Sequence, residues 1–352
     1  MVGAGSTKSG FVRWLRRGSI LIGGLAILLA SLGATYQLVG TWLDTRRFPQ
    51  QGRSVQAGPI KMNIDCTGSG WPTVILEQGA GAPAIGWRKV QPEIAEFTRV
   101  CSYDRAGYGW SEKGPMPRTV SEMAKELKAL LDASGEKGPY ILVAASLGGP
   151  IVRLYAGLYP NDVSGMVLVD ASHEDQLRRV QAIQPPELIA ESQRITASFE
   201  RRDRILRPLD FYFGIDRFEV HYQQQPPTMP REFWEEILYL AQRNRTWITV
   251  DSEVQSLPES VAALSQFNLG DRPLIVLTRG KFSFFPERYL TKEIEDRTRD
   301  LWIHGIQAEE ARLSTRGKQI VVADSDHLIM FERPDAVVSA VHEVWSELAR
   351  VH

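Results

Sequence analysis

The longest apolar stretch of the chain lies near its amino terminus. Residues 18–43 form 26 consecutive positions without a formal charge and are rich in leucine and isoleucine. A helix of that length measures about 39 Å, which is enough to cross a bilayer core of about 30 Å with some tilt. We therefore predict a transmembrane signal anchor at residues 18–43.

The charges before this stretch predict its orientation. Residues 1–17 carry Lys8, Arg13, Arg16 and Arg17 and no acidic residue. Because positive charge favours the cytoplasmic side of a membrane, residues 1–17 are expected to be cytoplasmic, and the rest of the chain periplasmic or otherwise extracytoplasmic. A cleaved signal peptide and a long buried core helix are the two alternatives.

Beyond a predicted linker at residues 44–58, short apolar runs alternate with helical patterns. Several runs are rich in β-branched residues or leucine and lack alternation, which is typical of strands buried on both faces of a sheet. Strands are predicted at residues 60–66, 73–78, 99–103, 140–145, 165–169, 274–278 and 319–323, and helices at 120–134 and 149–158. This order predicts an α/β fold with a mostly parallel sheet.

The alternation stops between Val169 and Leu274, where about a hundred residues show helical periodicity and many aromatic side chains. An unstructured connection of that length is uncommon in a compact domain. We predict a helical cap at residues 173–267. The core would then consist of residues 59–172 and 268–352, with the cap inserted after the strand at 165–169.

Composition excludes several classes of protein. Of the 352 residues, 43% are hydrophobic and 24% charged, which supports a sizeable core and excludes a disordered chain. The 41 basic and 42 acidic residues give a net charge of -1, so there is no basic field for nucleic acid. Two cysteines cannot form a four-thiolate zinc site, and no His-Glu-x-x-His motif is present, so neither a metal nor another cofactor is expected.

A serine directly follows the predicted strand at residues 140–145. The sequence there reads Ala144-Ala-Ser146-Leu-Gly148-Gly149 and leads into a predicted helix. This is the context of a nucleophile elbow, a turn so tight that the neighbours of the serine must be small. Ala144 stands where the motif usually has glycine. Backbone N–H groups at the helix start favour developing negative charge, so Ser146 is the candidate nucleophile. An ordinary glycine-rich connection is the alternative.

Four further segments, together with this elbow, resemble the α/β-hydrolase superfamily over about residues 59–350. They are Leu76-Glu-Gln-Gly-Ala-Gly81, Tyr103-Asp-Arg-Ala-Gly-Tyr-Gly-Trp-Ser111, Tyr159-Pro160 with the run to Asp170, and Asp326-His327 with Glu332-Arg-Pro334. The resemblance implies an α/β-hydrolase fold with a helical cap after its sixth strand. It also implies that the first segment is the oxyanion loop.

In that family, two backbone N–H groups stabilise the oxyanion, and the resemblance assigns them to Ala80 and Leu147. The same loop has a rival interpretation. Residues 79–84 fit a dinucleotide-binding Gly-x-Gly-x-x-Ala pattern after a strand. Pro83 within the loop and the lack of a clear ribose-binding acid argue against a dinucleotide.

A serine hydroxyl needs a neighbouring base. Among six histidines, His327 follows a strand near the carboxyl end, and the family's order of nucleophile, acid and histidine also selects it. A surface-loop role is the alternative. His173 could line the site or begin a helix. His221, His304, His342 and His352 have no independent support.

The acid of the triad is less clearly marked. Many family members place it after the seventh strand, where this chain has no carboxylate until Glu287, and others place it at the end of the sixth strand, where Asp170 stands. We select Asp170, which could hold the correct histidine tautomer. A helix-cap role for Asp170 is the alternative. Asp324 and Asp326 lie too close in sequence to His327 to orient it.

The family's strand order makes the strands with Cys66 and Cys101 neighbours. Adjacent strands are about 4.8 Å apart, which is near the Cα separation that a disulfide tolerates. An extracytoplasmic location would favour oxidation. A Cys66–Cys101 disulfide is therefore expected, with two buried thiols as the alternative.

Together these features predict a membrane-anchored serine hydrolase. Ser146 would attack an acyl carbon, His327 would transfer the proton and Asp170 would orient His327. A carboxylic ester is the expected substrate, ahead of an amide or thioester. An inactive membrane-tethered binding protein with the same fold is the alternative, because fold does not determine function. The sequence leaves the oligomeric state open.

Overall fold

A computed structural model describes residues 7–222, 229–243, 246–260, 264, 267–282 and 291–350. The chain divides into two compact units. One consists of Met1–Pro49 with Gln193–Gln224, and the other of Gln50–Ser192 with Gln225–His352.

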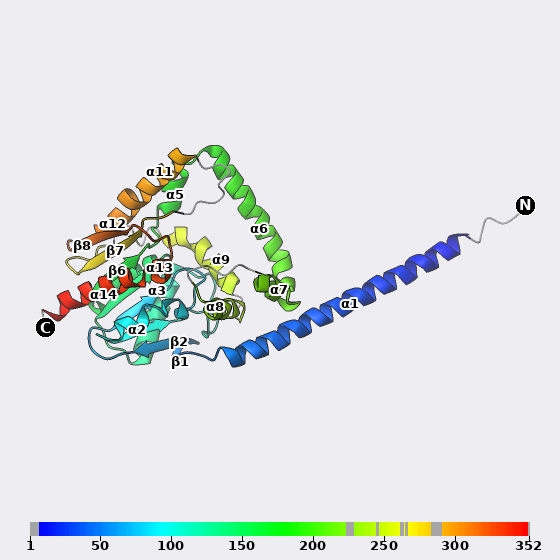
Figure 1. Ribbon diagram of the computed structural model, residues 1–352, viewed down its shortest axis with the longest axis horizontal. Coiled ribbons are helices and arrows are strands. Elements are labelled where there is room, and N and C mark those ends of the chain that lie inside the picture. The colour runs from blue at the N-terminus through cyan, green and yellow to red at the C-terminus, as the bar shows by residue number, and fades with distance from the viewer. Residues whose placement is uncertain are drawn as a thin grey trace, which may run out of the picture. The chain divides into compact units, whose positions relative to one another are not determined.

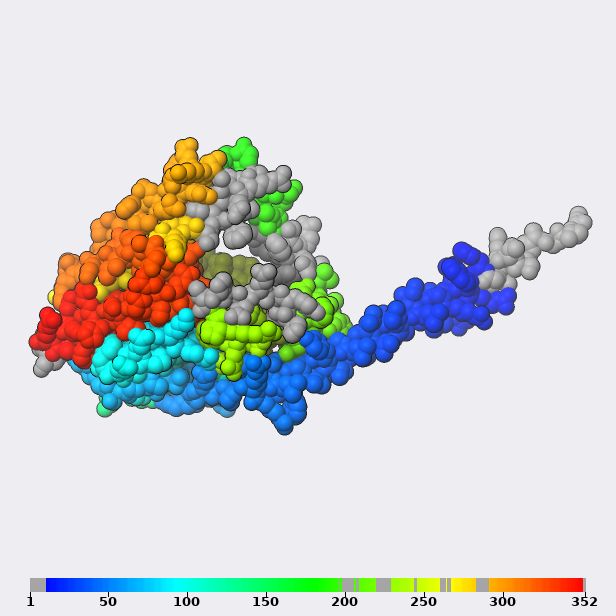
Figure 2. Space-filling view, in the orientation of Figure 1, coloured from blue at the N-terminus to red at the C-terminus, as the bar shows by residue number. Residues whose placement is uncertain are grey.

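The first unit is dominated by helix α1, Thr7–Arg47. Within it, Phe11–Arg47 is the one helix among the described residues that is long and apolar enough to cross a membrane. Its apolar side chains are widely exposed, with Leu21 and Ile22 at 73% and 71% (Figure 2). The predicted span at residues 18–43 lies inside α1, which begins before residue 18 and continues to Arg47.

The carboxyl-terminal part of α1 packs on other residues of the same unit. The Arg217 guanidinium, on α7 (Ile215–Tyr222), lies 2.6 Å from a carboxylate oxygen of Asp44. At Gly33 an added Cβ would come 2.2 Å from the carbonyl oxygen of Phe213. A glycine is therefore required at that crossing, since any side chain would collide with backbone.

The second unit contains an eight-stranded sheet with the order β1-β2-β4-β3-β5-β6-β7-β8 (Figure 1). β1 and β2, and β2 and β4, pair antiparallel, and the other neighbours pair parallel. The strands are Arg53–Ala57, Ile60–Thr67, Val74–Glu77, Val100–Tyr103, Tyr140–Ala145, Val163–Val169, Leu274–Arg279 and Gly317–Val322. The predicted α/β fold with a mostly parallel sheet is confirmed.

The structure differs from the sequence prediction at β1. This strand lies in the segment 44–58 that was expected to be a linker. Val55 and Ala57 alternate with exposed residues and are 6% and 2% exposed. A segment of five residues with two apolar positions is too short to show a periodic pattern. Its strand conformation is stabilised by hydrogen bonding to β2, which the local sequence does not reveal.

Helices cover both faces of the sheet. α3 (Val120–Ser134) and α4 (Gly148–Leu158) pack together on one face, where their buried side chains join those of the strands in one core. α14 (Pro334–Ala349) packs on the opposite face, where Val344 lies against Gly165 of β6, with α2 (Gln91–Ile94) beside it. Such double coverage explains why the parallel strands lack alternation.

The interval between β6 and β7 is helical in its described residues. Its helices are α5 (Gln176–Gln181), α6 (Pro186–Tyr212), α7, α8 (Arg231–Arg243) and α9 (Thr246–Ser256). Phe233 and Tyr239 of α8 are each 4% exposed. The Phe233 ring lies 5.7 Å from the ring of Phe331 on α13 (Ile329–Glu332) and under the Arg88 guanidinium, so it packs against residues outside the predicted cap. After β7 come α11 (Lys292–Asp300), the π-helix Leu301–Gln307, α12 (Ala308–Ala311), β8 and α13.

Cys66 and Cys101 face each other across the antiparallel pair β2 and β4 and form a disulfide. Their Cα atoms are 4.0 Å apart, and the two cysteines are separated by 35 positions in the sequence. A link that closes such a loop restricts the unfolded chain.

Replacing both cysteines by alanine (C66A/C101A) is expected to lower the free energy of unfolding by about 2–4 kcal/mol. Urea denaturation of the protein measures this free energy. The midpoint of the transition should fall, while the fold is retained in the absence of urea. The same loss should follow reduction of the unchanged protein. An unchanged midpoint in both experiments would show that the bond is absent or contributes nothing.

Candidate active site

Ser146 lies in the turn between β5 and α4, where the sequence predicted a nucleophile elbow. Its φ angle is 48°, a left-handed conformation that non-glycine residues adopt rarely and mostly at functional sites. The neighbouring glycines show how tight the turn is. An added Cβ at Gly148 would come 2.7 Å from the Glu77 side chain, and one at Gly149 would come 2.6 Å from Ala171. Small residues after Ser146 are therefore required by packing.

The loop after β3 lies against Ser146. An added Cβ at Gly79 would come 2.9 Å from the Cβ of Ser146 and 3.6 Å from its hydroxyl oxygen. The loop then enters a single turn, Ala84–Trp87, and the N–H of Gly81 donates to the Tyr108 hydroxyl at 3.1 Å. The structure thus disfavours the dinucleotide interpretation, which needs a longer helix and a free glycine loop.

Asp170 follows β6 at the same level at which Ser146 follows β5. Ala145 and Val169 are register partners in the parallel pair, so the next residue of each strand emerges at one edge of the sheet. Asp170 also has a positive φ, 44°, and its side chain is fully buried. Two adjacent strands therefore end in strained, non-glycine residues.

The buried Asp170 carboxylate has three partners from distant parts of the chain. Its Oδ2 lies 2.6 Å from Nδ1 of His327. Its Oδ1 accepts hydrogen bonds from the Trp302 indole at 2.8 Å and from the Arg279 backbone N–H at 3.2 Å. A buried carboxylate needs such partners, and these hold the Asp170 carboxylate group in one orientation.

His327 lies in the loop after β8, and that loop is held by its own side chains. The Asp326 carboxylate accepts from the His327 backbone N–H at 2.7 Å, and the Glu332 carboxylate accepts from the Asp326 N–H at 2.9 Å. The His327 side chain is 39% exposed. Its Nδ1 is engaged by Asp170, which leaves the Nε2 edge of the ring available for proton transfer.

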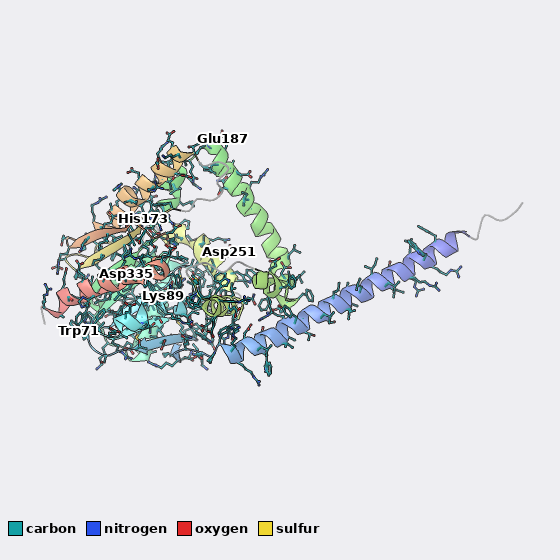
Figure 3. The ribbon with its side chains drawn as sticks, viewed as in Figure 1. Trp71, Lys89, His173, Glu187, Asp251 and Asp335 are labelled. Carbon is teal, nitrogen blue, oxygen red and sulfur yellow. A yellow bond between two sulfur atoms is a disulfide. The ribbon has the colours of Figure 1, made fainter. Side chains whose placement is uncertain are left out.

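The other candidates lie elsewhere or serve structure. His173, labelled in Figure 3, accepts from the Asp175 N–H at 3.0 Å and so begins α5. Asp324 pairs with Arg333. His304 and His342 are exposed. Glu287 and His352 lie outside the described residues, and the side chain of His221 is not described.

Two residues at the site had no signal in the sequence. Trp302 and Arg279 supply hydrogen bonds to Asp170, one from the π-helix before α12 and the other from the end of β7. Neither residue belongs to a motif, and its distance along the sequence from Asp170 gives no sign of the contact. Only the proximity of β6, β7 and this π-helix brings the three residues together.

Two clusters of the described residues have the donor atoms of a metal site, and in the first, Cys66, Cys101 and Glu136, the two thiols are joined in the disulfide. The second contains two glutamates and a histidine. His173, Glu174 and Glu310 offer ligand atoms within 4.8 Å of one another. The buried Arg153 guanidinium already lies 2.7 Å from Glu174 and 2.8 Å from Glu310. Burial raises the pKa of Glu310 to about 7, against the opposing effect of Arg153. The cation that this cluster accommodates is therefore a guanidinium, which ties α4 to α12.

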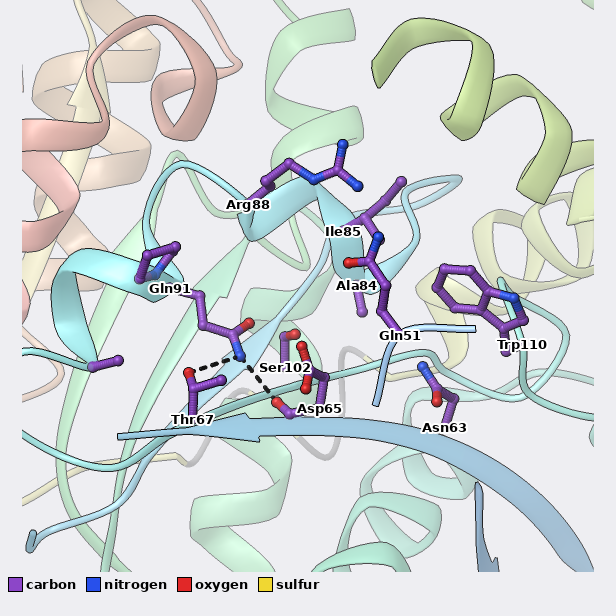
Figure 4. A pocket seen from close by; sticks show the side chains of 12 residues that line it. Gln51, Asn63, Asp65, Thr67, Ala84, Ile85, Arg88, Gln91, Ser102 and Trp110 are labelled. Atoms are coloured by element: carbon purple, nitrogen blue, oxygen red, sulfur yellow. Dashed lines mark hydrogen bonds between the residues drawn. The ribbon is translucent and has the colours of Figure 1, made fainter. Parts of the chain in front are cut away.

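A cavity of about 350 Å³ lies on the sheet away from these residues (Figure 4). It is lined by side chains of β2, β4 and α2 together with Ile85, Arg88 and Trp110. Gln91 crosses its floor and donates to the Asp65 carbonyl at 3.0 Å. Ser146, Asp170 and His327 are not among its lining residues.

The chain is similar to known proteins in sequence and in structure. Residues 72–249, half of the chain, match the family model described as alpha/beta hydrolase fold. YqjL of Bacillus subtilis, an uncharacterized protein, is 36% identical over 108 residues, which cover 31% of this chain and 43% of YqjL. The chain thus matches less than half the length of that relative.

Among solved structures, a thermophilic esterase from Thermogutta terrifontis aligns with a TM-score of 0.58 at 20% identity, over 85% of this chain and 99% of the esterase. The epoxide hydrolase CorEH aligns with a TM-score of 0.56 at 16% identity, over 84% of this chain and 98% of CorEH. At these identities the likeness concerns the fold. The family match, the sheet order and the inserted helices agree, and the chain belongs to the alpha/beta hydrolase fold family.

Proposed function

We propose that this protein is a serine hydrolase that cleaves a carboxylic ester through an acyl-enzyme. The observation that carries the proposal is the 2.6 Å contact between His327 Nδ1 and the buried Asp170, at the sheet edge from which Ser146 emerges. Asp170 holds the tautomer in which Nε2 is the base, and stabilises the imidazolium that forms during proton transfer.

The reaction would proceed in two halves. His327 removes the Ser146 proton as the hydroxyl oxygen attacks the acyl carbon, and the resulting oxyanion faces the N–H groups of Ala80 and Leu147. Collapse of this intermediate breaks the bond to the alcohol oxygen, which takes the proton from His327. Water, deprotonated by His327, then attacks the acyl carbon, and the bond to Ser146 breaks as His327 returns the proton to the serine oxygen, which releases the acid and regenerates Ser146.

The identity of the nucleophile supports acyl transfer. A family member with aspartate at the elbow would point to epoxide or dehalogenase chemistry, whereas a serine with an adjacent base is suited to acyl compounds. Amides and thioesters also contain an acyl carbon that a serine can attack, and we rank them after esters as substrates. The competing proposal, an inactive tethered binding protein, has no use for a strained serine at the sheet edge from which Asp170, the partner of His327, also emerges.

Replacing the nucleophile (S146A) is expected to abolish labelling by a fluorophosphonate probe and to lower ester turnover by about 10⁴-fold or more. Only an activated serine reacts with the probe, so gel fluorescence of the intact protein measures it. The matched control is S164A, a hydroxyl on β6 that donates to the Tyr140 carbonyl. Equal labelling of S146A and the unchanged protein, or no labelling of either, would reject the proposal.

Replacing the acid (D170N) is expected to lower kcat for a chromogenic ester by about 10⁴-fold, because the amide would stabilise the wrong histidine tautomer. The fold should persist, since an amide can still accept from Trp302. D162N provides the control, because Asp162 accepts from Tyr155 away from the site. Near-normal turnover of D170N would remove Asp170 from the proposed triad.

We further propose that α1 anchors the protein in a membrane with its amino terminus in the cytoplasm. The support is the apolar helix Phe11–Arg47, its exposed side chains and the basic residues that precede its apolar part. The small-molecule acyl substrate would then be hydrolysed outside the cytoplasm.

Carbonate extraction of membranes from an expressing strain is expected to leave the intact protein in the pellet, and a variant without residues 1–47 is expected in the supernatant. In sealed right-side-out vesicles, added protease should digest the hydrolase unit. Release of the full chain by carbonate would refute the anchor, and protection from protease would reverse the orientation.

A further inference from the structure

The oxyanion loop, residues 78–81, is held by a cluster that the proposed reaction does not use. Arg105 and Tyr108 follow β4, and Glu253 lies on α9, the helix that Asp251 marks in Figure 3. Arg105, Tyr108 and Glu253 are 3%, 1% and 0% exposed. A buried charge and a buried phenol at this depth require dedicated partners.

Arg105 and Tyr108 bind the backbone of the loop directly. The Arg105 guanidinium donates to the Gln78 carbonyl at 2.5 Å and to the Gly79 carbonyl at 3.0 Å. The Tyr108 hydroxyl accepts from the Gly81 N–H at 3.1 Å. Three consecutive peptide groups of the loop are thus fixed by two side chains.

These contacts determine where the Ala80 N–H points. The Gly79 carbonyl and the Ala80 N–H belong to one planar, trans peptide group, so they point in opposite directions. Arg105 holds the carbonyl on its own side, and the N–H is therefore directed away from Arg105. If this peptide turned over, a carbonyl oxygen would replace the donor, and an oxyanion would meet negative charge.

Glu253 in turn fixes Arg105 and Tyr108. Its carboxylate accepts from Arg105 Nε at 3.1 Å and from an Arg105 terminal nitrogen at 3.0 Å. It also accepts from the Tyr108 hydroxyl at 2.6 Å. A phenol has one proton, and because Tyr108 gives it to Glu253, its oxygen can act only as acceptor toward Gly81.

The remaining partner of Arg105 comes from the sheet. Glu77, the last residue of β3, accepts from Arg105 at 2.5 Å and also from the Tyr103 hydroxyl. Burial raises the pKa of Glu77 to about 7, and the charge of Glu253 adds to the rise while Arg105 opposes it. The Arg105 guanidinium thus lies between two buried carboxylates, Glu77 on the sheet and Glu253 on α9.

The helix that carries Glu253 is seated on the segment between β4 and α3. The Thr246 hydroxyl donates to the Gly107 carbonyl at 3.3 Å, and the Ser252 hydroxyl accepts from the Arg118 N–H at 2.9 Å. An added Cβ at Gly107, whose φ is 89°, would come 2.2 Å from Thr249. The glycine at 107 thus lets α9 approach closely enough for Glu253 to reach Arg105.

We propose that Glu253 is a positioning residue for the oxyanion hole, acting through Arg105 and Tyr108, so that seating of cap helix α9 completes the catalytic site. This inference rests on the proposed function and extends it: the cap would control kcat as well as cover the substrate. Chemistry would be switched on only when α9 is in place.

The test compares E253Q and Y108F with the unchanged protein on a short chromogenic ester. Both variants are expected to lower kcat by about 10–100-fold, less than the 10²–10³-fold that loss of an oxyanion donor costs. KM should change less than about threefold, because the donors act on the transition state. A role in folding alone would lower the fraction of active enzyme, which fluorophosphonate titration of active sites corrects for.

E236Q is the matched control. Glu236 is also a buried carboxylate on a predicted cap helix, and its hydrogen-bond partners in the described structure are Arg88 and Gln51 rather than residues that hold 78–81. Its kcat per titrated site should be unchanged. If E253Q and Y108F match E236Q in kcat, the positioning role is wrong.

Amide hydrogen exchange of the peptide that covers residues 78–84 gives a readout without activity. Exchange should be faster in Y108F and E253Q than in the unchanged protein and E236Q, because the Gly81 N–H loses its acceptor or its fixed geometry. Unchanged exchange in both variants overturns the inference. Faster exchange in a protein that no fluorophosphonate labels would support the coupling of α9 to the loop while rejecting the proposed function.

Discussion

The parallel pairing of β5 with β6 is the constraint on which the candidate site depends. It brings Ser146 and Asp170 out at one edge of the sheet, each on a backbone in the left-handed region. The turn after β5 is also tightly packed, because a Cβ added at Gly148 or Gly149 would collide with Glu77 or Ala171. Strained residues of this kind persist only where the surrounding structure holds them.

Burial makes the electrostatics of this edge strong. Asp170, Glu77, Arg105 and Glu253 are all removed from water, and each is matched by an opposite charge or by hydrogen-bond donors. In a low dielectric, such interactions strengthen and an unmatched group becomes costly. The proposed oxyanion loop and the acid of the proposed triad are thus supported by separate polar networks, one toward α9 and the other toward the π-helix before α12.

The sequence predicted those parts of the molecule that depend on local pattern. Seven of the eight strands and α3 follow from apolar runs and helical periodicity, and motifs after strands point to Ser146, Asp170 and His327 as the candidate site residues. The short edge strand β1 and the partners Trp302, Arg279 and Glu253 could not be predicted. Their roles arise from contacts between segments far apart in the chain, for which no spacing along the sequence gives a signal.

The disulfide between Cys66 and Cys101 lies in a different part of the sheet from the candidate site. It fastens the antiparallel margin, β1 and β2, to the first of the parallel strands, whereas Ser146 and Asp170 emerge from strands further across the sheet. Reducing the disulfide would loosen this margin of the sheet, while the candidate site keeps hydrogen-bonded strands on either side. Stability and the proposed activity would therefore depend on separate regions, and the reduced protein would be less stable without being inactive.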